Sequence, residues 1–315
     1  MKDHDIRPGK GCFEAAVVSN TPVRHCYYRL NLQLDARGSA LFRQVRPGQF
    51  AELDLSRLAL PAAEAIDASL RDRVARSIIL RRPFSFSDVR LASDSPPVIC
   101  VEILYCVVGP STLRMTTLRP QDVISVIGPL GNGFSVPPHK RLAILIAGGM
   151  GSPPLQHLAE YLRANFADMR VVVFAGAKRL EDFPFVVNVL DGGQCVPQEF
   201  ARLGEEAFVT TDDGSAGVKG FVTDCADAWL AQHTTKPEET IIYACGPEAM
   251  LAAVASLAQK HGLDCQVSME RMMACGIGLC QSCAVQVRAS GGETAYKLCC
   301  NDGPVFDAKE VVFLR

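Results

Sequence analysis

Residues 142–155 read LAILIAGGMGSPPL, an apolar run followed by a glycine-rich turn and two prolines. The run 142–147 predicts a buried strand, and 153–166 has the spacing of a helix that opens at a proline. Glycines in such a turn let a pyrophosphate approach the free N–H groups at the start of the helix. The candidate nicotinamide-binding residues of this turn are Gly148, Gly149 and Gly151.

The segments that follow repeat this alternation of strand and helix. We expect apolar strands at 170–175 and 240–244, and helices at 223–232 and 247–261. Such alternation predicts a parallel sheet with covering helices, and ligands bind beyond the carboxyl ends of its strands. The turn Cys245-Gly246-Pro247 lies at one such end, which makes it a second candidate nicotinamide contact. A plain strand-end cysteine would show the same pattern.

The residues before Pro137 follow a different rhythm, in which short β-branched runs alternate with Gly- and Pro-rich turns. That pattern is typical of an antiparallel barrel or sandwich. Only 55–79, rich in Ala, Leu and Arg, breaks it and indicates a helical or loop-like insertion. The sequence therefore predicts three domains: an antiparallel β-barrel over 1–137, a parallel-sheet α/β domain over 138–262 and a small C-terminal domain over 263–315.

A candidate flavin site lies in the first of these domains. Arg82-Pro83-Phe84-Ser85 follows a β-like segment, and a guanidinium suits pyrophosphate oxygens. An edge strand with a surface arginine would look the same, but two small-residue turns that could offer backbone N–H groups favour a flavin site. The candidate flavin contacts are Arg82, Pro83, Phe84, Ser85, Gly109, Ser111, Thr112, Gly131, Asn132 and Gly133.

The C-terminal stretch concentrates cysteines, of which the chain has 13. Cys275, Cys280 and Cys283 form a C-x4-C-x2-C pattern, and the pair Cys299-Cys300 follows. This is the spacing of a plant-type [2Fe–2S] cluster. A structural zinc site and a disulfide are the alternatives, although zinc prefers C-x2-C knuckles and a reducing cytoplasm disfavours disulfides. Strand alternation implies that one of the last two cysteines faces the irons, without choosing between them.

Charge and hydropathy limit the partners. The 315-residue chain has a formal net charge of -2, which gives no reason to expect nucleic acid. No apolar run approaches the roughly 18 residues that cross a bilayer. Residues 1–20 also lack the apolar core preceded by positive charge that marks a signal peptide. We therefore expect a cytoplasmic protein with no membrane or nucleic-acid partner.

The order of these motifs resembles the ferredoxin-reductase superfamily, and the tail is similar to the electron-transfer subunits of class 1B, NAD-dependent dihydroorotate dehydrogenases. The likeness in the tail rests on RMMACGIGLC at 271–280 and CNDGPVF at 300–306, and TDDGSAGVKGF at 211–221 also fits. In that family one residue separates the fourth cluster ligand from an Asp-Gly-Pro or Glu-Gly-Pro turn. The resemblance thus implies the metal ligands Cys275, Cys280, Cys283 and Cys300.

The resemblance also implies an NAD-linked iron–sulfur flavoprotein oxidoreductase subunit in pyrimidine biosynthesis. Electrons would leave the FMN of a separate catalytic subunit, cross the [2Fe–2S] cluster and FAD, and reduce NAD+. The first domain would then bind FAD and the second NAD. The two kinds of subunit are expected as a heterotetramer of two plus two, and this chain would have no catalytic side chain or dihydroorotate site of its own.

Three alternatives stay open at this point. The chain could serve a sulfide dehydrogenase, a transhydrogenase or a hydrogenase as its FAD and [2Fe–2S] subunit. It could be a redox-sensing module, which the nicotinamide turns argue against, or a zinc-bearing binding protein. Lys178 and Arg179 could meet the 2′-phosphate of NADP or be solvated surface charges.

Overall fold

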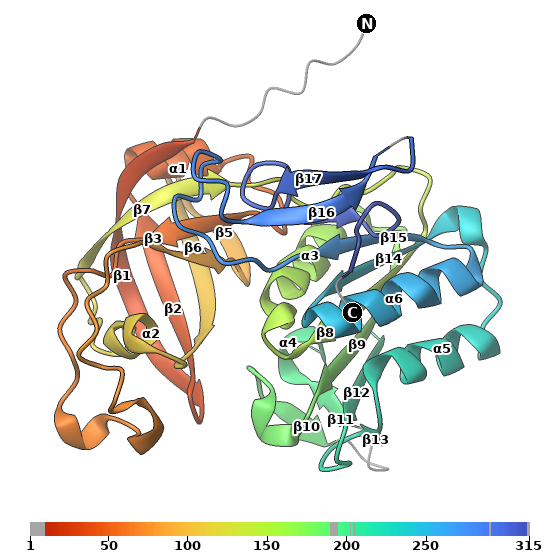
Figure 1. Cartoon of the computed structure of the whole chain (residues 1–315), viewed down its shortest axis with the longest axis horizontal. Coiled ribbons are helices and arrows are strands. Elements are labelled where there is room, and N and C mark those ends of the chain that lie inside the picture. The colour runs from red at the N-terminus through yellow and green to blue at the C-terminus, as the bar shows by residue number, and fades with distance from the viewer. Residues whose placement is uncertain (1–9, 190–194, 202, 204–205, 290, 314–315) are drawn as a thin grey trace, which may run out of the picture.

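The computed structural model describes residues 10–189, 195–201, 203, 206–289 and 291–313. Two sheets lie side by side, one from each half of the chain (Figure 1). The C-terminal segments run across the edge where the two halves meet (Figure 1). This arrangement places residues of all three expected domains around one junction.

The N-terminal sheet is an antiparallel half-barrel in the order β4-β3-β7-β1-β2-β6-β5. In β1, buried Phe13, Ala15 and Val17 alternate with more exposed neighbours, as expected of a strand with one face on the core. Its strands are β1 Gly11–Arg24, β2 Tyr27–Leu34, β3 Phe50–Leu53, β4 Arg82–Ser85, β5 Asp88–Asp94, β6 Pro97–Cys106 and β7 Val123–Leu130, and its helices are α1 Ala36–Phe42 and α2 Pro110–Met115.

The insertion at 55–79 is a loop with two 3₁₀ turns, η1 Ala63–Ala65 and η2 Ala68–Leu70. Its apolar residues Ile66 and Leu70 pack against Leu113 of α2. The loop therefore covers the short helix that follows β6, and it extends away from the body of the half-barrel (Figure 1).

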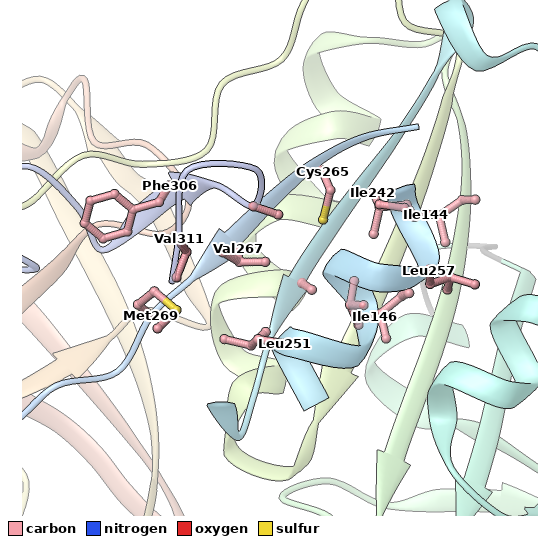
Figure 2. Packing of buried hydrophobic residues seen from close by; sticks show 14 of the residues in the cluster. Ile144, Ile146, Ile242, Leu251, Leu257, Cys265, Val267, Met269, Phe306 and Val311 are labelled. Carbon is pink, nitrogen blue, oxygen red and sulfur yellow. The ribbon is translucent and has the colours of Figure 1, made fainter. Parts of the chain in front are cut away.

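The second sheet has the order β13-β12-β9-β8-β14-β15-β18 and is parallel except for β18. Its central strands are apolar throughout because helices cover both faces; Ile144, Ile146 and Ile242 pack with Leu251 and Leu257 of α6 (Figure 2). Its strands are β8 Leu142–Gly148, β9 Arg170–Ala177, β12 Glu206–Thr211, β13 Val218–Lys219, β14 Thr240–Cys245, β15 Asp264–Ser268 and β18 Val305–Asp307. The remaining elements of this half are η3 Gly149–Gly151, α3 Ser152–Asn165, η4 Leu180–Asp182, α4 Gln198–Ala201, α5 Val222–Gln232, η5 Pro237–Glu239 and α6 Glu248–His261, and the antiparallel pair β10 Val187–Val189 and β11 Cys195–Pro197.

The C-terminal segment shares its core with this sheet. After α6 ends at Gly262, β15 pairs parallel with β14, so the strand–helix repeat runs across the expected boundary at 262/263. β18 then adds antiparallel to β15, and Val267, Met269, Phe306 and Val311 lie in one cluster (Figure 2). Only the hairpin of β16 Ala284–Arg288 and β17 Thr294–Leu298 forms a separate sheet. The division into three domains stays a prediction, and its last boundary cuts the parallel sheet.

A search of the described ranges for a helix long and apolar enough to cross a membrane found none.

Candidate functional site

A cleft of about 360 Å³ lies at the junction of the two sheets and the C-terminal segment. Its size is in the range of small-molecule and cofactor sites. The half-barrel contributes Phe50, Pro83, Phe84, Ser85, Leu104, Tyr105, Cys106, Val108 and Thr112. The rest of the wall is Met150, Pro153, Pro154, Cys245, Ser268, Met269, Glu270, Arg271, Met273 and Pro304.

The predicted flavin tetrapeptide forms one wall of this cleft. It is β4, an edge strand that pairs only with β3, and an edge position tolerates the missing N–H of Pro83. Pro83, Phe84 and Ser85 line the cleft. The half-buried Arg82 side chain donates to the carbonyls of Leu80 and Arg81 at 2.9 and 3.1 Å. Its guanidinium therefore lies at the end of the strand that forms the wall.

The turn predicted after β6 is the start of α2. Gly109 caps the helix and Pro110 occupies its first turn, where a missing N–H costs no helical hydrogen bond. Thr112 lines the cleft, and its hydroxyl accepts from the backbone N–H of Val108 at 3.0 Å. Ser111 is buried and does not line the cleft. Of this group, the structure brings Thr112 alone to the cleft wall.

The loop at 131–133 has a different surrounding from the one expected of a flavin loop. The backbone N–H and side-chain amide of Asn132 donate to the carbonyls of Gly303, Asn301 and Asp302. A Cβ on Gly131 would lie 2.5 Å from Pro304, and one on Gly133 would lie 2.4 Å from the Pro47 carbonyl. Protein fills the space that the glycines leave open. The loop therefore joins the half-barrel to the C-terminal segment, and a cofactor contact there stays a prediction.

The two predicted nicotinamide turns meet at the carboxyl edge of the parallel sheet. A Cβ on Gly151 would lie 2.1 Å from the Cys245 carbonyl oxygen, and one on Gly148 would lie 2.6 Å from the Met250 sulfur. Gly246 lies against Gly148 in turn. Gly149 has open space around it and a φ of +50°. Close backbone packing thus requires glycine at Gly151, and the left-handed φ favours it at Gly149. At Gly148 and Gly246 a side chain would have to displace Met250.

Cys245 is the strand-end residue of this pair of turns and lines the cleft beside Ser268, its neighbour in the β14–β15 register. Burial raises the pKa of the Cys245 thiol, and a hydrogen bond with Ser268 opposes the shift. The side chain is therefore a neutral thiol at neutral pH, suited to contacting a ligand without adding charge.

The four candidate ligand cysteines form two contacting pairs. The backbone N–H of Cys280 donates to the Cys275 sulfur, and that of Cys300 donates to the Cys283 sulfur, both at 3.4 Å. Hydrogen bonds from Ser282 lower the pKa of the Cys280 thiol to about 6, which favours the thiolate that binds iron. A [2Fe–2S] cluster takes four cysteine ligands, and backbone N–H groups aimed at sulfur suit it. The assignment of these four cysteines as its ligands stays a prediction. Within the described ranges, no three Cys, His, Asp or Glu side chains are arranged to hold a metal ion by themselves.

Two family models match the chain. The iron–sulfur cluster binding domain of dihydroorotate dehydrogenase B matches residues 270–312, and the oxidoreductase NAD-binding domain matches residues 145–256. A dihydroorotate dehydrogenase B (NAD(+)) electron transfer subunit from Geobacillus thermodenitrificans is 35% identical over 94% of this chain and 96% of its own length. The chain belongs to this family of electron-transfer subunits. The subunit of the same name from Caldanaerobacter subterraneus is 37% identical over 74% of this chain and 81% of its own length.

Solved structures agree on the fold. The NADH-dependent reduced ferredoxin-NADP oxidoreductase, studied for flavin-based electron bifurcation, has a TM-score of 0.68 at 25% identity and covers 95% of this chain and 90% of its own. Phthalate dioxygenase reductase is a modular protein for electron transfer from pyridine nucleotides to [2Fe–2S]. Its match covers 91% of this chain and 77% of its own length, with a TM-score of 0.51. At 16% identity that second likeness concerns the fold alone. The expected ferredoxin-reductase-like architecture is confirmed.

The loop 275–283 is called the cluster loop below. Beyond it, the side chains of Cys299 and Cys300 point in different directions. The Cys299 thiol, fully buried, donates to the Met269 carbonyl at 3.2 Å. Cys300 instead contacts Cys283; burial and that neighbour raise the pKa of the Cys300 thiol to about 12. The pairing supports the assignment of Cys300 as the fourth ligand, which remains a proposal.

Sequence reasoning missed Glu52, which lies directly beneath the cluster loop. Its side chain is only 1% exposed, and its Oε1 atom has no hydrogen-bond partner. A Cβ on Gly276 would lie 2.5 Å from that oxygen, so glycine is required there. Burial raises the pKa of Glu52. The signal in the sequence was a glutamate inside the apolar strand run 50–53, because glutamate is almost never fully buried unless it is paired.

Proposed function

We propose that this chain carries electrons from the FMN of a dihydroorotate dehydrogenase catalytic subunit, through a [2Fe–2S] cluster and FAD, to NAD+. The observation that carries the proposal is the shared cleft. It is lined by the β4 wall, by residues of both nicotinamide turns, and by 268–271 and Met273, which lead directly into the cluster loop. Electron transfer needs cofactors close together, and one cleft with three such walls brings their sites together.

Different residues in and beside the cleft would contact different parts of the cofactors. Ser85 and Thr112 line the cleft and offer hydroxyls to a flavin, and Cys245 contacts the nicotinamide side without charge. Arg82, at the end of β4, offers a charged donor to the flavin's pyrophosphate. FAD supplies the ability to exchange both single electrons and hydride. The apolar wall of Phe50, Phe84 and Leu104 excludes water from the same space.

The chemistry around Arg179 favours NAD over NADP. Arg179 forms ion pairs with Glu181 at 2.6 Å and Asp182 at 3.4 Å. A 2′-phosphate would have to compete with two carboxylates for this guanidinium and would be repelled by both. The residue is therefore better described as a surface ion-pair partner than as a phosphate receptor.

The cluster loop and Met272 just before it also carry the candidate surface for the catalytic partner. Met272 and Leu279 are 89% and 78% exposed, and Ile277 is partly exposed beside them in sequence. Apolar side chains next to a redox centre are expected to be covered by a partner, because buried interface cores are apolar. We propose that an FMN-bearing subunit covers this surface in a heterotetramer of two plus two. A cytoplasmic location remains a prediction from the sequence.

The test is co-expression with an FMN-containing dihydroorotate dehydrogenase catalytic subunit, followed by size-exclusion chromatography and assay of dihydroorotate-dependent NADH formation. We expect co-elution of FAD, FMN and iron with this activity. Leu279→Asp should break the complex and leave the bound cluster's absorbance in place. Val218→Asp, on the far edge strand β13, is the matched control and should leave the complex intact. Separate elution of the wild-type chains would contradict the proposal and direct attention to other partner reductases.

A further inference from the structure

Two cysteines outside the cluster loop are in direct contact at the edge of the cleft. The sulfurs of Cys26 and Cys106 lie 3.2 Å apart, and both residues are half-buried free thiols. Cys106 is the last residue of β6 and lines the cleft. Cys26 lies in the two-residue turn that joins β1 to β2.

The backbone holds these two residues in register. β2 and β6 pair with Tyr27 opposite Cys106, and the N–H of Val107 donates to the Cys26 carbonyl at 2.8 Å. Residues in successive strand positions would point to opposite faces. Strand alternation does not apply to Cys26, because it lies in the turn and follows His25, which has a φ of +37°. The turn therefore brings its sulfur to the same side as that of Cys106.

The two thiols differ in their surroundings. Burial and the adjacent Cys26 raise the pKa of the Cys106 thiol to about 12. Cys106 therefore stays protonated. Cys26 lies in the β1–β2 turn beside the exposed His25, which gives an oxidant access to its sulfur. Tyr27, which follows Cys26 and pairs with Cys106 in the register, donates its hydroxyl to the Asp182 carbonyl at 3.0 Å and so joins the half-barrel to the α/β half. The pair thus lies where the two halves meet.

We propose that Cys26 and Cys106 are a modification site, a dithiol that a hydroperoxide converts to a reversible disulfide at the edge of the cofactor cleft. The Cys26 sulfur attacks a peroxide oxygen, the O–O bond breaks, and Cys26 becomes a sulfenic acid as an alcohol or water leaves. The Cys106 sulfur then attacks the Cys26 sulfur. The S–S bond forms, and water departs with the sulfenic oxygen and the Cys106 proton. Overall the two thiols lose two electrons and two protons, and the hydroperoxide takes up both.

The two sulfurs, 3.2 Å apart, need to move little to reach bonding distance. A disulfide needs its sulfurs about 2.05 Å apart on backbone positions that are already neighbours, which a paired strand end and turn provide. The resulting link would connect the β1–β2 turn to the end of β6, beside the Tyr27–Asp182 contact. Because Cys106 lines the cleft, the modification would restrain the wall that the cofactors contact.

The test uses the full-length protein with its cofactors bound, treated with a small excess of hydrogen peroxide. Remaining thiols are then alkylated, and the digested protein is mapped by mass spectrometry without reduction. We expect a peptide pair linked through Cys26 and Cys106 that disappears after treatment with dithiothreitol. Cys26→Ser and Cys106→Ser should each abolish the link, and in Cys106→Ser the sulfenic acid of Cys26 should be captured by dimedone.

Cys12→Ser is the matched control, because Cys12 is an exposed thiol on β1 of the same half-barrel. It should keep the linked pair. Wild-type protein whose two thiols are both alkylated after peroxide would overturn the proposal, as would Cys26 oxidised to a sulfinic acid with no link. The measurement needs no catalytic partner, so its outcome is independent of the proposed electron path.

Discussion

The cluster loop and the cofactor cleft are built from the chain in opposite ways. Three of the four candidate cluster ligands lie within 275–283, and the fourth arrives from the end of one hairpin strand. The cleft draws its wall from Phe50 through Pro304, across both sheets. A local loop can be recognised from residue spacing, whereas a cleft built from distant segments exists only once both sheets are packed. The following predictions test how separate the two sites are.

The largest effect is expected at the fourth ligand. Cys300→Ser should remove the cluster or strongly change its EPR spectrum, because one thiolate of the two sulfur pairs is lost. Cys299→Ser should keep the cluster, since its thiol contacts the Met269 carbonyl instead. Iron and acid-labile sulfide contents, with EPR of the reduced protein, measure both. Retention of the cluster in Cys300→Ser alone would reverse the assignment.

Arg82→Ala tests the cleft in the same way. Hydrogen bonds to charged groups contribute about 1.5–3 kcal/mol, so FAD affinity should fall by at least about tenfold. The cluster should be unaffected if the two sites are separate. Flavin content after gel filtration and the iron content of the same sample give the comparison. Arg90→Ala, an exposed arginine of β5 that pairs with Asp88, is the control. Wild-type flavin retention in Arg82→Ala would remove this arginine from the site.

Asn132→Ala tests the joint between the half-barrel and the cluster segment. It leaves the carbonyls of Asn301 and Asp302 without their donor, at a cost of about 1–3 kcal/mol in the free energy of unfolding. We expect a lower urea midpoint and faster cluster loss on standing, with FAD affinity nearly unchanged. A selective loss of FAD with normal stability would instead show that 131–133 is a flavin loop.

The smallest effect is a pH dependence at the junction of the halves. His157 of α3 is buried with no partner at Nδ1, and burial lowers its pKa to about 4. The unfolded chain takes up a proton near pH 6.5 and the folded one does not, so stability is lost as pH falls from about 6.5 towards 4. Between about pH 7.5 and 5.5 this should amount to about 1 kcal/mol.

Urea unfolding at the two pH values measures this difference. His157→Gln should reduce it, and His139→Gln, at an exposed position, should leave it as in the wild type. An unchanged pH dependence in His157→Gln would assign it to other groups.

The sequence predicted the elements well where a pattern repeats. The apolar run 142–147, the expected helix at 247–261 and the strand 240–244 correspond to β8, α6 and β14. The sequence indicated an insertion at 55–79 but not what it packs against. Its packing on α2 depends on Leu113, which lies far along the chain. The expected boundary at 262/263 falls between two neighbouring strands of one sheet, because a single strand such as β15 has no local mark of the sheet that it joins. The division into domains stays a prediction.

Residue type and spacing by themselves determined the strand–turn–helix at 142–155 and the crowded thiols of 275–283, and the resemblance of the motifs pointed to a redox family. Such features depend on local backbone geometry and on residues within one loop. Only the tertiary structure decided that the glycines at 131 and 133 accommodate protein, that Glu52 lies under the cluster loop, and that Cys26 meets Cys106. The physical reason is that close packing joins residues distant in the chain, and the sequence of one segment says nothing of the atoms that another brings against it.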